Sequence, residues 1–159
     1  MDATKLTIAT PTDCEVVLAR VFDASADLVF RALTEPELLK RWYGPTGWEM
    51  MVCDIDLRVG GKWRIVSRKP GGKQIGQFGV YSEIVRPTRI VNSEAWEDWD
   101  AGETLVTTQL TERDGKTTFE STILFPSKEV RDTVVKSGLE HSAAETYDKL
   151  SQLLTEAKR

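Results

Sequence analysis

The stretch LEHSAAETYDKLSQLLTEA, residues 139–157, decides the fold because it predicts a long amphipathic helix. Its apolar residues recur three and four positions apart, which places them on one face of a helix. These residues are Leu139, Ala143, Tyr147, Leu150, Leu153, Leu154 and Ala157. Since such a stripe needs an apolar partner, we expect Tyr147, Leu150 and Leu154 to dock this helix against a sheet.

The sheet is predicted from residues 48–125, where the apolar residues alternate with a period of two. Turn signals divide this region, and a loop is expected near residues 98–102. The turns are Arg58–Gly61, Pro70–Gly72, Arg86–Thr88 and Asp114–Gly115. Together with a β-branched segment over residues 14–22, the pattern predicts about seven strands in an antiparallel meander.

Two short helices are expected between the first strand and the rest of the sheet. Ser25 is placed to cap the first helix, and Thr34–Glu37 has the pattern of a capping box for the second. The second helix should run through Trp42 and stop at Gly44–Pro45. Ser127 is expected to cap another short helix, which breaks at Gly138.

The predicted order is therefore one strand, two helices, six strands and the long helix, an α+β fold in one domain over residues 1–159. A single helix is too narrow to cover a curved sheet of this size. Space between the two layers must then be filled by large side chains or by a ligand, so we expect an internal cavity.

Composition restricts the chemistry that this chain performs. The formal charge of the 159 residues is −4, which argues against nucleic-acid binding. No apolar run reaches the length of a membrane span, and none resembles a signal peptide. The single histidine, His141, excludes a histidine-rich metal site, and no phosphate-binding glycine motif occurs. We expect no metal, nucleotide or flavin cofactor, free thiols at Cys14 and Cys53, and a cytoplasmic location.

Four segments resemble bacterial domains of the START-like (SRPBCC) superfamily. They are RVFDASADLVFRALTEPELLKRWYGP (20–45), DIDLRVGGKWRIVSRKPGG (54–72), GVYSEIVRPTRIV (79–91) and SGLEHSAAETYDKLSQLL (137–154). The nearest branch is named after the activator of the ninety-kilodalton heat-shock chaperone's ATPase. The resemblance implies a helix-grip fold, in which a curled sheet grips the last helix around a pocket. Its members include lipid carriers, polyketide cyclases and co-chaperones, so it does not fix the activity.

The sequence departs from the family pattern in two features. Tyr43 stands where the family often has a second tryptophan. The eukaryotic co-chaperones carry an additional N-terminal domain that binds the chaperone, whereas only about a dozen residues precede the first expected strand here.

The aromatic side chains around the predicted pocket are the main candidates for a ligand site. Trp42 is expected to fasten its helix to the core, while Tyr43 and Trp48 have either a structural or a ligand-contacting role. Trp63, Phe78, Tyr81, Trp96 and Phe119 are assigned to inward-compatible strand positions. Each is compatible with a place in the plain core, and together they favour a pocket for a flat, apolar ligand. Trp99 is expected in the 98–102 loop, either as a lid or simply exposed.

Few polar residues are candidates for the interior. Glu94 shares strand parity with Trp96 and is expected to orient a ligand or act as a general acid. His141 and Glu145 are one turn apart, which suits either an ion pair or an ordinary solvated helix face. The ligand-binding set is therefore Tyr43, Trp48, Trp63, Phe78, Tyr81, Glu94, Trp96, Phe119, His141 and Tyr147, with no residue assigned as catalytic.

Three functions follow, in order of preference. The first is non-catalytic binding of a hydrophobic small molecule or lipid-like ligand. The alternatives are an enzyme resembling polyketide cyclases or aromatases, and a co-chaperone that regulates a heat-shock chaperone.

Overall fold

The structure, a computed structural model, describes residues 4–44 and 46–157. The strands are β1 (Thr7–Ala9), β2 (Glu15–Phe22), β3 (Glu49–Ile55), β4 (Lys62–Arg68), β5 (Gln74–Val85), β6 (Arg89–Trp96), β7 (Trp99–Arg113) and β8 (Lys116–Leu124). The helices are α1 (Ala26–Thr34), α2 (Pro36–Trp42), α3 (Lys128–Lys136) and α4 (Leu139–Ala157). The strands form one antiparallel sheet in the order β1-β2-β8-β7-β6-β5-β4-β3.

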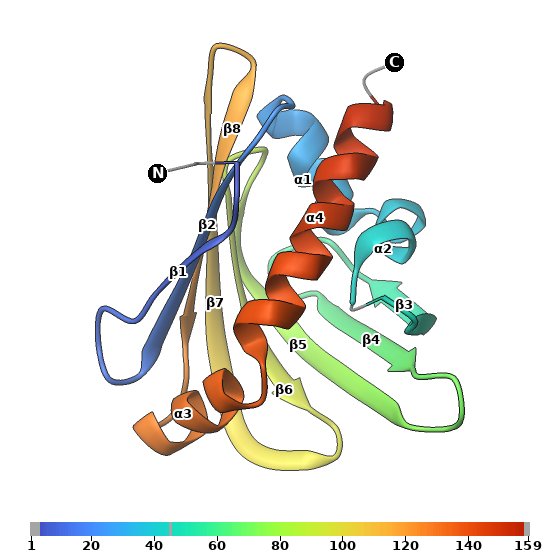
Figure 1. Cartoon of the computed structure of the whole chain (residues 1–159), viewed down its shortest axis with the longest axis vertical. Coiled ribbons are helices and arrows are strands. Elements are labelled where there is room, and N and C mark those ends of the chain that lie inside the picture. The colour runs from blue at the N-terminus through green and yellow to red at the C-terminus, as the bar shows by residue number, and fades with distance from the viewer. Residues whose placement is uncertain (1–3, 45, 158–159) are drawn as a thin grey trace.

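Helix α4 lies across one face of this curved sheet, with α1 and α2 beside its C-terminal half and α3 near its N-terminal end (Figure 1). This arrangement confirms the expected α+β helix-grip fold. On the opposite face of the sheet, the charged side chains of Lys62, Arg64 and Arg68 are exposed, as the alternation in β4 predicts.

The sheet differs from the prediction at two places. Strand β1 adds an eighth strand, which pairs with β2 through Ile8 opposite Leu18. Three residues are too few for an alternating pattern to be recognised, which is why this strand was not expected. The loop expected over residues 98–102 is wrong, because Trp96 pairs directly with Trp99 and β7 begins there.

The helix termini confirm two expected caps and contradict one. The hydroxyls of Ser25 and Ser127 accept hydrogen bonds from the first turns of α1 and α3. The capping box at Thr34 is wrong: Thr34 is the last residue of α1, and its hydroxyl donates to the carbonyl of Phe30 at 2.8 Å. Glu35 takes the N-cap position of α2 without a side-chain bond, and Pro45, expected to end this helix, lies outside the described residues.

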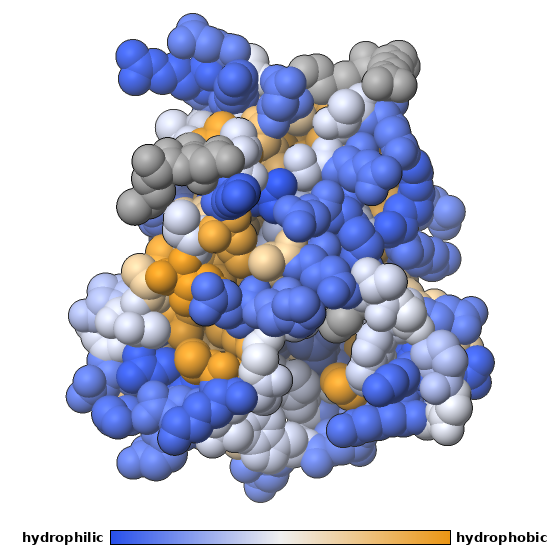
Figure 2. All heavy atoms as spheres, in the orientation of Figure 1, coloured by the Kyte–Doolittle hydropathy of each residue, from blue (hydrophilic) through white to orange (hydrophobic). Residues whose placement is uncertain are grey.

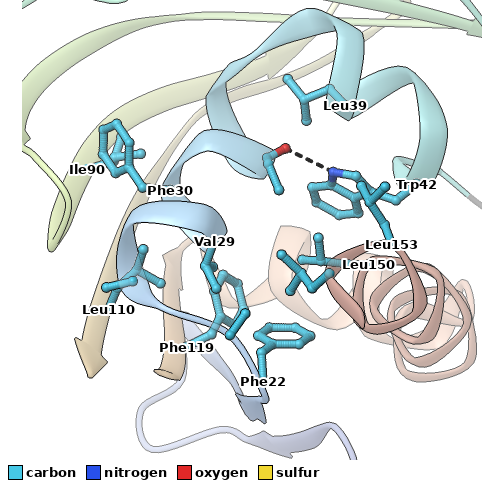
Figure 3. Packing of buried hydrophobic residues seen from close by; sticks show 14 of the residues in the cluster. Phe22, Val29, Phe30, Leu39, Trp42, Ile90, Leu110, Phe119, Leu150 and Leu153 are labelled. Atoms are coloured by element: carbon cyan, nitrogen blue, oxygen red, sulfur yellow. Dashed lines mark hydrogen bonds between the residues drawn. The ribbon is translucent and has the colours of Figure 1, made fainter. Parts of the chain in front are cut away.

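The core lies between the sheet and the helices (Figure 3). Leu150 and Leu154 of α4 are fully buried, and Tyr147 packs beside them, which confirms how this helix was expected to dock. The rings of Phe22 and Phe119 meet edge to face, with centroids 5.9 Å apart.

Trp42 is the structural fastener that the sequence predicts. Its side chain is buried, and its indole Nε1 donates to the carbonyl of Ala32 at 2.9 Å (Figure 3). That carbonyl belongs to the last turn of α1, where backbone acceptors have no partner inside the helix. One side chain of α2 therefore completes the end of α1 and fixes the angle between the two helices.

Candidate functional site

Side chains of α4 hold the segment between α2 and β3, which carries two of the candidate aromatics. The carboxylate of Glu145 accepts a hydrogen bond from the backbone amide of Thr46, and the ammonium group of Lys149 donates to the carbonyl of Gly44. These contacts place Tyr43 and Trp48 between the helix and the end of the sheet, where both line a cavity.

The cavity between sheet and helices has two chambers, and the inner one has a volume of about 150 Å³. Its walls come from α1, α2 and α4 and from the inward faces of β3 to β8. The main aromatic residues of this wall are Trp42, Trp63, Tyr81 and Phe119, joined by aliphatic side chains such as Leu39 and Ile90.

The outer chamber is larger, at about 400 Å³, and opens to the surface. It lies between the N-terminal half of α4, the α3–α4 turn and the inner sheet face, with a recess visible beside α4 in Figure 2. Its apolar lining residues include Trp48, Ile75, Trp96, Ile123, Phe125 and Leu139.

Among the described residues, Tyr43, Glu94 and Tyr147 line both chambers, and we call the place where the chambers adjoin the waist. The hydroxyl of Tyr43 donates to Oε1 of Gln77 at 2.8 Å, which fixes that ring. The ring of Tyr147 packs against Phe119, with centroids 5.0 Å apart. The waist therefore combines two aromatic side chains with one carboxyl group.

Burial raises the pKa of Glu94 to about 7, since the apolar surroundings disfavour the charged form. Burial also raises the pKa of both Tyr43 and Tyr147, and the nearby carboxylate of Glu94 raises them further. Across the sheet, Glu94 pairs with Thr104, whose hydroxyl is buried and has no hydrogen-bond partner in the part of the chain that is described. No hydrogen bond or ion pair from another described residue reaches the Glu94 carboxylate.

The inner chamber has a polar back wall that the sequence analysis missed. Asn92, Thr108 and Ser121 line it, and Thr108 pairs with Ser121 across β7 and β8. Thr108 lies two positions from Leu110 in β7, and Ser121 lies two positions from Phe119 in β8, so each faces inward like its buried neighbour. The sequence signal for this wall was the presence of polar residues at strand positions that share the parity of core residues.

Of the ten candidate residues, eight line the cavity and two do not. Phe78 was expected to face inward, but its side chain is 44% exposed and lies opposite Arg64 on the outer face of the sheet. His141 is also outside the cavity: its side chain is 89% exposed and lies 3.6 Å from the carboxylate of Glu145. Trp99 is partly exposed at the start of β7, with its ring against Trp96.

The described residues contain no cluster of three or more histidine, cysteine or acidic side chains that could hold a metal ion. Cys14 and Cys53 are free thiols. Among residues 4–44 and 46–157, no helix combines the length and apolarity needed to cross a membrane.

Comparison with known proteins identifies the family. The family described as Activator of Hsp90 ATPase homolog 1-like protein matches residues 23–155. A crystal structure of a Rhodobacter sphaeroides protein is 31% identical, covers 96% of this chain and 99% of that chain, and superimposes with a TM-score of 0.90. None of the curated proteins matches the chain.

More distant structures support the fold alone. A Nitrosomonas europaea protein is 24% identical over 94% of this chain and 99% of that chain, with a TM-score of 0.84. The AHSA1 protein of Silicibacter pomeroyi is 20% identical over 90% and 99% of the two chains, with a TM-score of 0.73. Since the family match spans most of the residues, this chain belongs to the Activator of Hsp90 ATPase homolog 1-like family and has its START-like fold.

Proposed function

We propose that this protein binds a hydrophobic small molecule in the two-chambered cavity without transforming it. The observation that carries the proposal is the cavity itself, whose outer chamber of about 400 Å³ falls within the usual size of ligand sites. Its lining also has the usual character, because many apolar and aromatic side chains surround a few polar groups that can orient a ligand.

A titration with N-phenyl-1-naphthylamine, a hydrophobic dye that brightens in apolar surroundings, tests this proposal. The wild-type protein should show saturable binding. Thr146→Phe places a larger side chain into the outer chamber and should weaken binding by about tenfold or more, a change of at least 1.4 kcal/mol.

The matched control is Gln152→Phe, which adds the same ring at an exposed position of the same helix. This variant should bind the dye as the wild type does. If Thr146→Phe also binds normally while its fold is intact, the dye occupies another surface and the cavity is not the binding site.

A second candidate function, a cyclase-like enzyme, is favoured by one observation. Burial raises the pKa of Glu94 to about 7, and this residue lines the cavity together with two tyrosines, which suits a general acid. A molecule that co-purifies with the protein should then change in mass on incubation with the wild type and remain unchanged with Glu94→Gln. Recovery of the same molecule from both would favour binding alone.

The family description also names activation of a chaperone ATPase, which makes a co-chaperone role the third candidate. This role predicts faster ATP turnover by the ninety-kilodalton heat-shock chaperone when the protein is added. Unchanged turnover at saturating protein would exclude it.

A further inference from the structure

We propose that the cavity selects a protonated amine flanked by apolar groups, with its ammonium group against Glu94 and an aromatic ring in the inner chamber. This inference rests on the proposed binding function and names the class of ligand.

The charge of the cavity lining is the first argument. The described residues that line the two chambers are apolar, aromatic, hydroxyl-bearing or amide-bearing, apart from Glu94. A carboxylate in such surroundings is costly unless a positive charge or hydrogen-bond donors compensate it. A ligand ammonium group provides both, whereas a fatty-acid carboxylate would add a second negative charge at the waist.

The aromatic waist is the second argument. Tyr43 and Tyr147 line both chambers together with Glu94, and the ring centroid of Trp42 lies 5.9 Å from that of Tyr147. Aromatic faces attract cations, and this attraction is stronger where water is excluded. Rings combined with a carboxylate therefore favour an organic ammonium ion over a neutral molecule of the same shape.

The sizes of the chambers set the form of the ligand. The inner chamber, about 150 Å³ and rich in apolar side chains, matches the volume at which an apolar protein cavity accepts one benzene ring. The outer chamber has room for a longer apolar group. An amine at the waist would thus join a ring on one side to an alkyl or aryl group on the other.

The groups around Glu94 decide how binding depends on pH. Tyr43 at the end of α2 and Tyr147 on α4 line the cavity near Glu94, Thr104 on β7 pairs with it across the sheet, and Tyr81 on β5 lines the inner chamber. Burial raises the pKa of each of the three tyrosines. These hydroxyls stay neutral around pH 7. The pKa of Glu94 itself is about 7, so the carboxylate becomes available to an ammonium ion as the pH rises through that value.

Calorimetric titration of the intact protein at pH 8 with three probes of similar size tests the inference. N-benzylhexylamine carries the ammonium group between a ring and an alkyl chain, benzyl hexyl ether replaces that group by a neutral oxygen, and 7-phenylheptanoic acid carries a carboxylate. We expect the amine to bind about tenfold or more tightly than either of the others. Glu94→Gln should remove this preference, so that the amine and the ether bind to the variant with affinities within about twofold of each other.

The pH dependence provides a second readout that needs no variant. Below pH 7, affinity for the amine should fall about tenfold per pH unit, because binding must then release the proton of Glu94, and affinity for the ether should stay constant.

The outcomes separate this inference from the function on which it rests. Equal binding of all three probes, or an amine preference that persists in Glu94→Gln, refutes the amine selectivity and leaves the cavity as a hydrophobic site. If none of the three binds, both the selectivity and the proposed binding function are wrong.

Discussion

Replacing Glu94 by glutamine should make the protein more stable at neutral and alkaline pH. Glutamine has nearly the same shape as glutamate but carries no charge at any pH. In the wild type, burial raises the pKa of Glu94 from its ordinary value of 4.5 to about 7. The folded state therefore holds a proton that the unfolded chain has already lost between these two values.

The magnitude and the sign follow from this difference. One pKa unit corresponds to about 1.4 kcal/mol, so ionising Glu94 costs the folded state at most about 3–4 kcal/mol. Since the unfolded state binds fewer protons in this window, the free energy of unfolding of the wild type should fall as the pH rises from 4.5 to about 7 and level off above it. The variant should lack this component.

Urea denaturation of both proteins between pH 4 and pH 9 measures the effect. The free energy of unfolding of Glu94→Gln minus that of the wild type should be near zero at the acid end and reach its maximum above pH 7. Glu103→Gln, which removes an exposed carboxylate from the neighbouring strand β7, serves as the control and should show no such rise. A difference that stays constant with pH would refute the argument that burial controls the ionisation of Glu94.

Three further substitutions test the packing. Leu150→Ala should lower the free energy of unfolding by about 2–5 kcal/mol, while Gln152→Ala at an exposed position of α4 should change it by less than about 0.5 kcal/mol. Trp42→Phe should cost about 1–3 kcal/mol, because a buried carbonyl of α1 loses its donor. Gly79→Ala should unfold or strongly destabilise the protein, since the new methyl group would lie 1.9 Å from a carbonyl oxygen of β6 and 2.6 Å from the indole nitrogen of Trp63. Urea midpoints measure all three, and a wild-type midpoint for any of them would contradict the packing described.

The sequence was sufficient to predict those parts of the fold in which strong local signals agree with the tertiary structure. The apolar stripe of residues 139–157 forms α4, and its predicted contacts through Leu150 and Leu154 are present. Asp114–Gly115 forms the two-residue turn between β7 and β8, with both residues at positive φ as such turns require. At these positions, local preference and burial favour the same conformation.

The prediction of the candidate site was less complete because strand faces depend on parity. Phe78 and Tyr81 are separated by an odd number of positions in β5, so a regular strand directs them to opposite faces, and the structure places only Tyr81 in the cavity. The inward assignment of Phe78 disregards this rule. Conversely, Asn92 and Ser121 were overlooked because polar residues in strands are usually assigned to the solvent face.

The two contacts from α4 to the segment between α2 and β3 have a consequence for motion. Glu145 and Lys149 are one helical turn apart and contact the backbone at Thr46 and Gly44, so these two residues are tied to the helix. A tilt of α4 that widens the waist would therefore strain or break these two contacts. Hydrogen exchange at the Thr46 amide would then report the loss of its bond to Glu145. A ligand that holds α4 in place would slow this exchange at a backbone position that it does not touch.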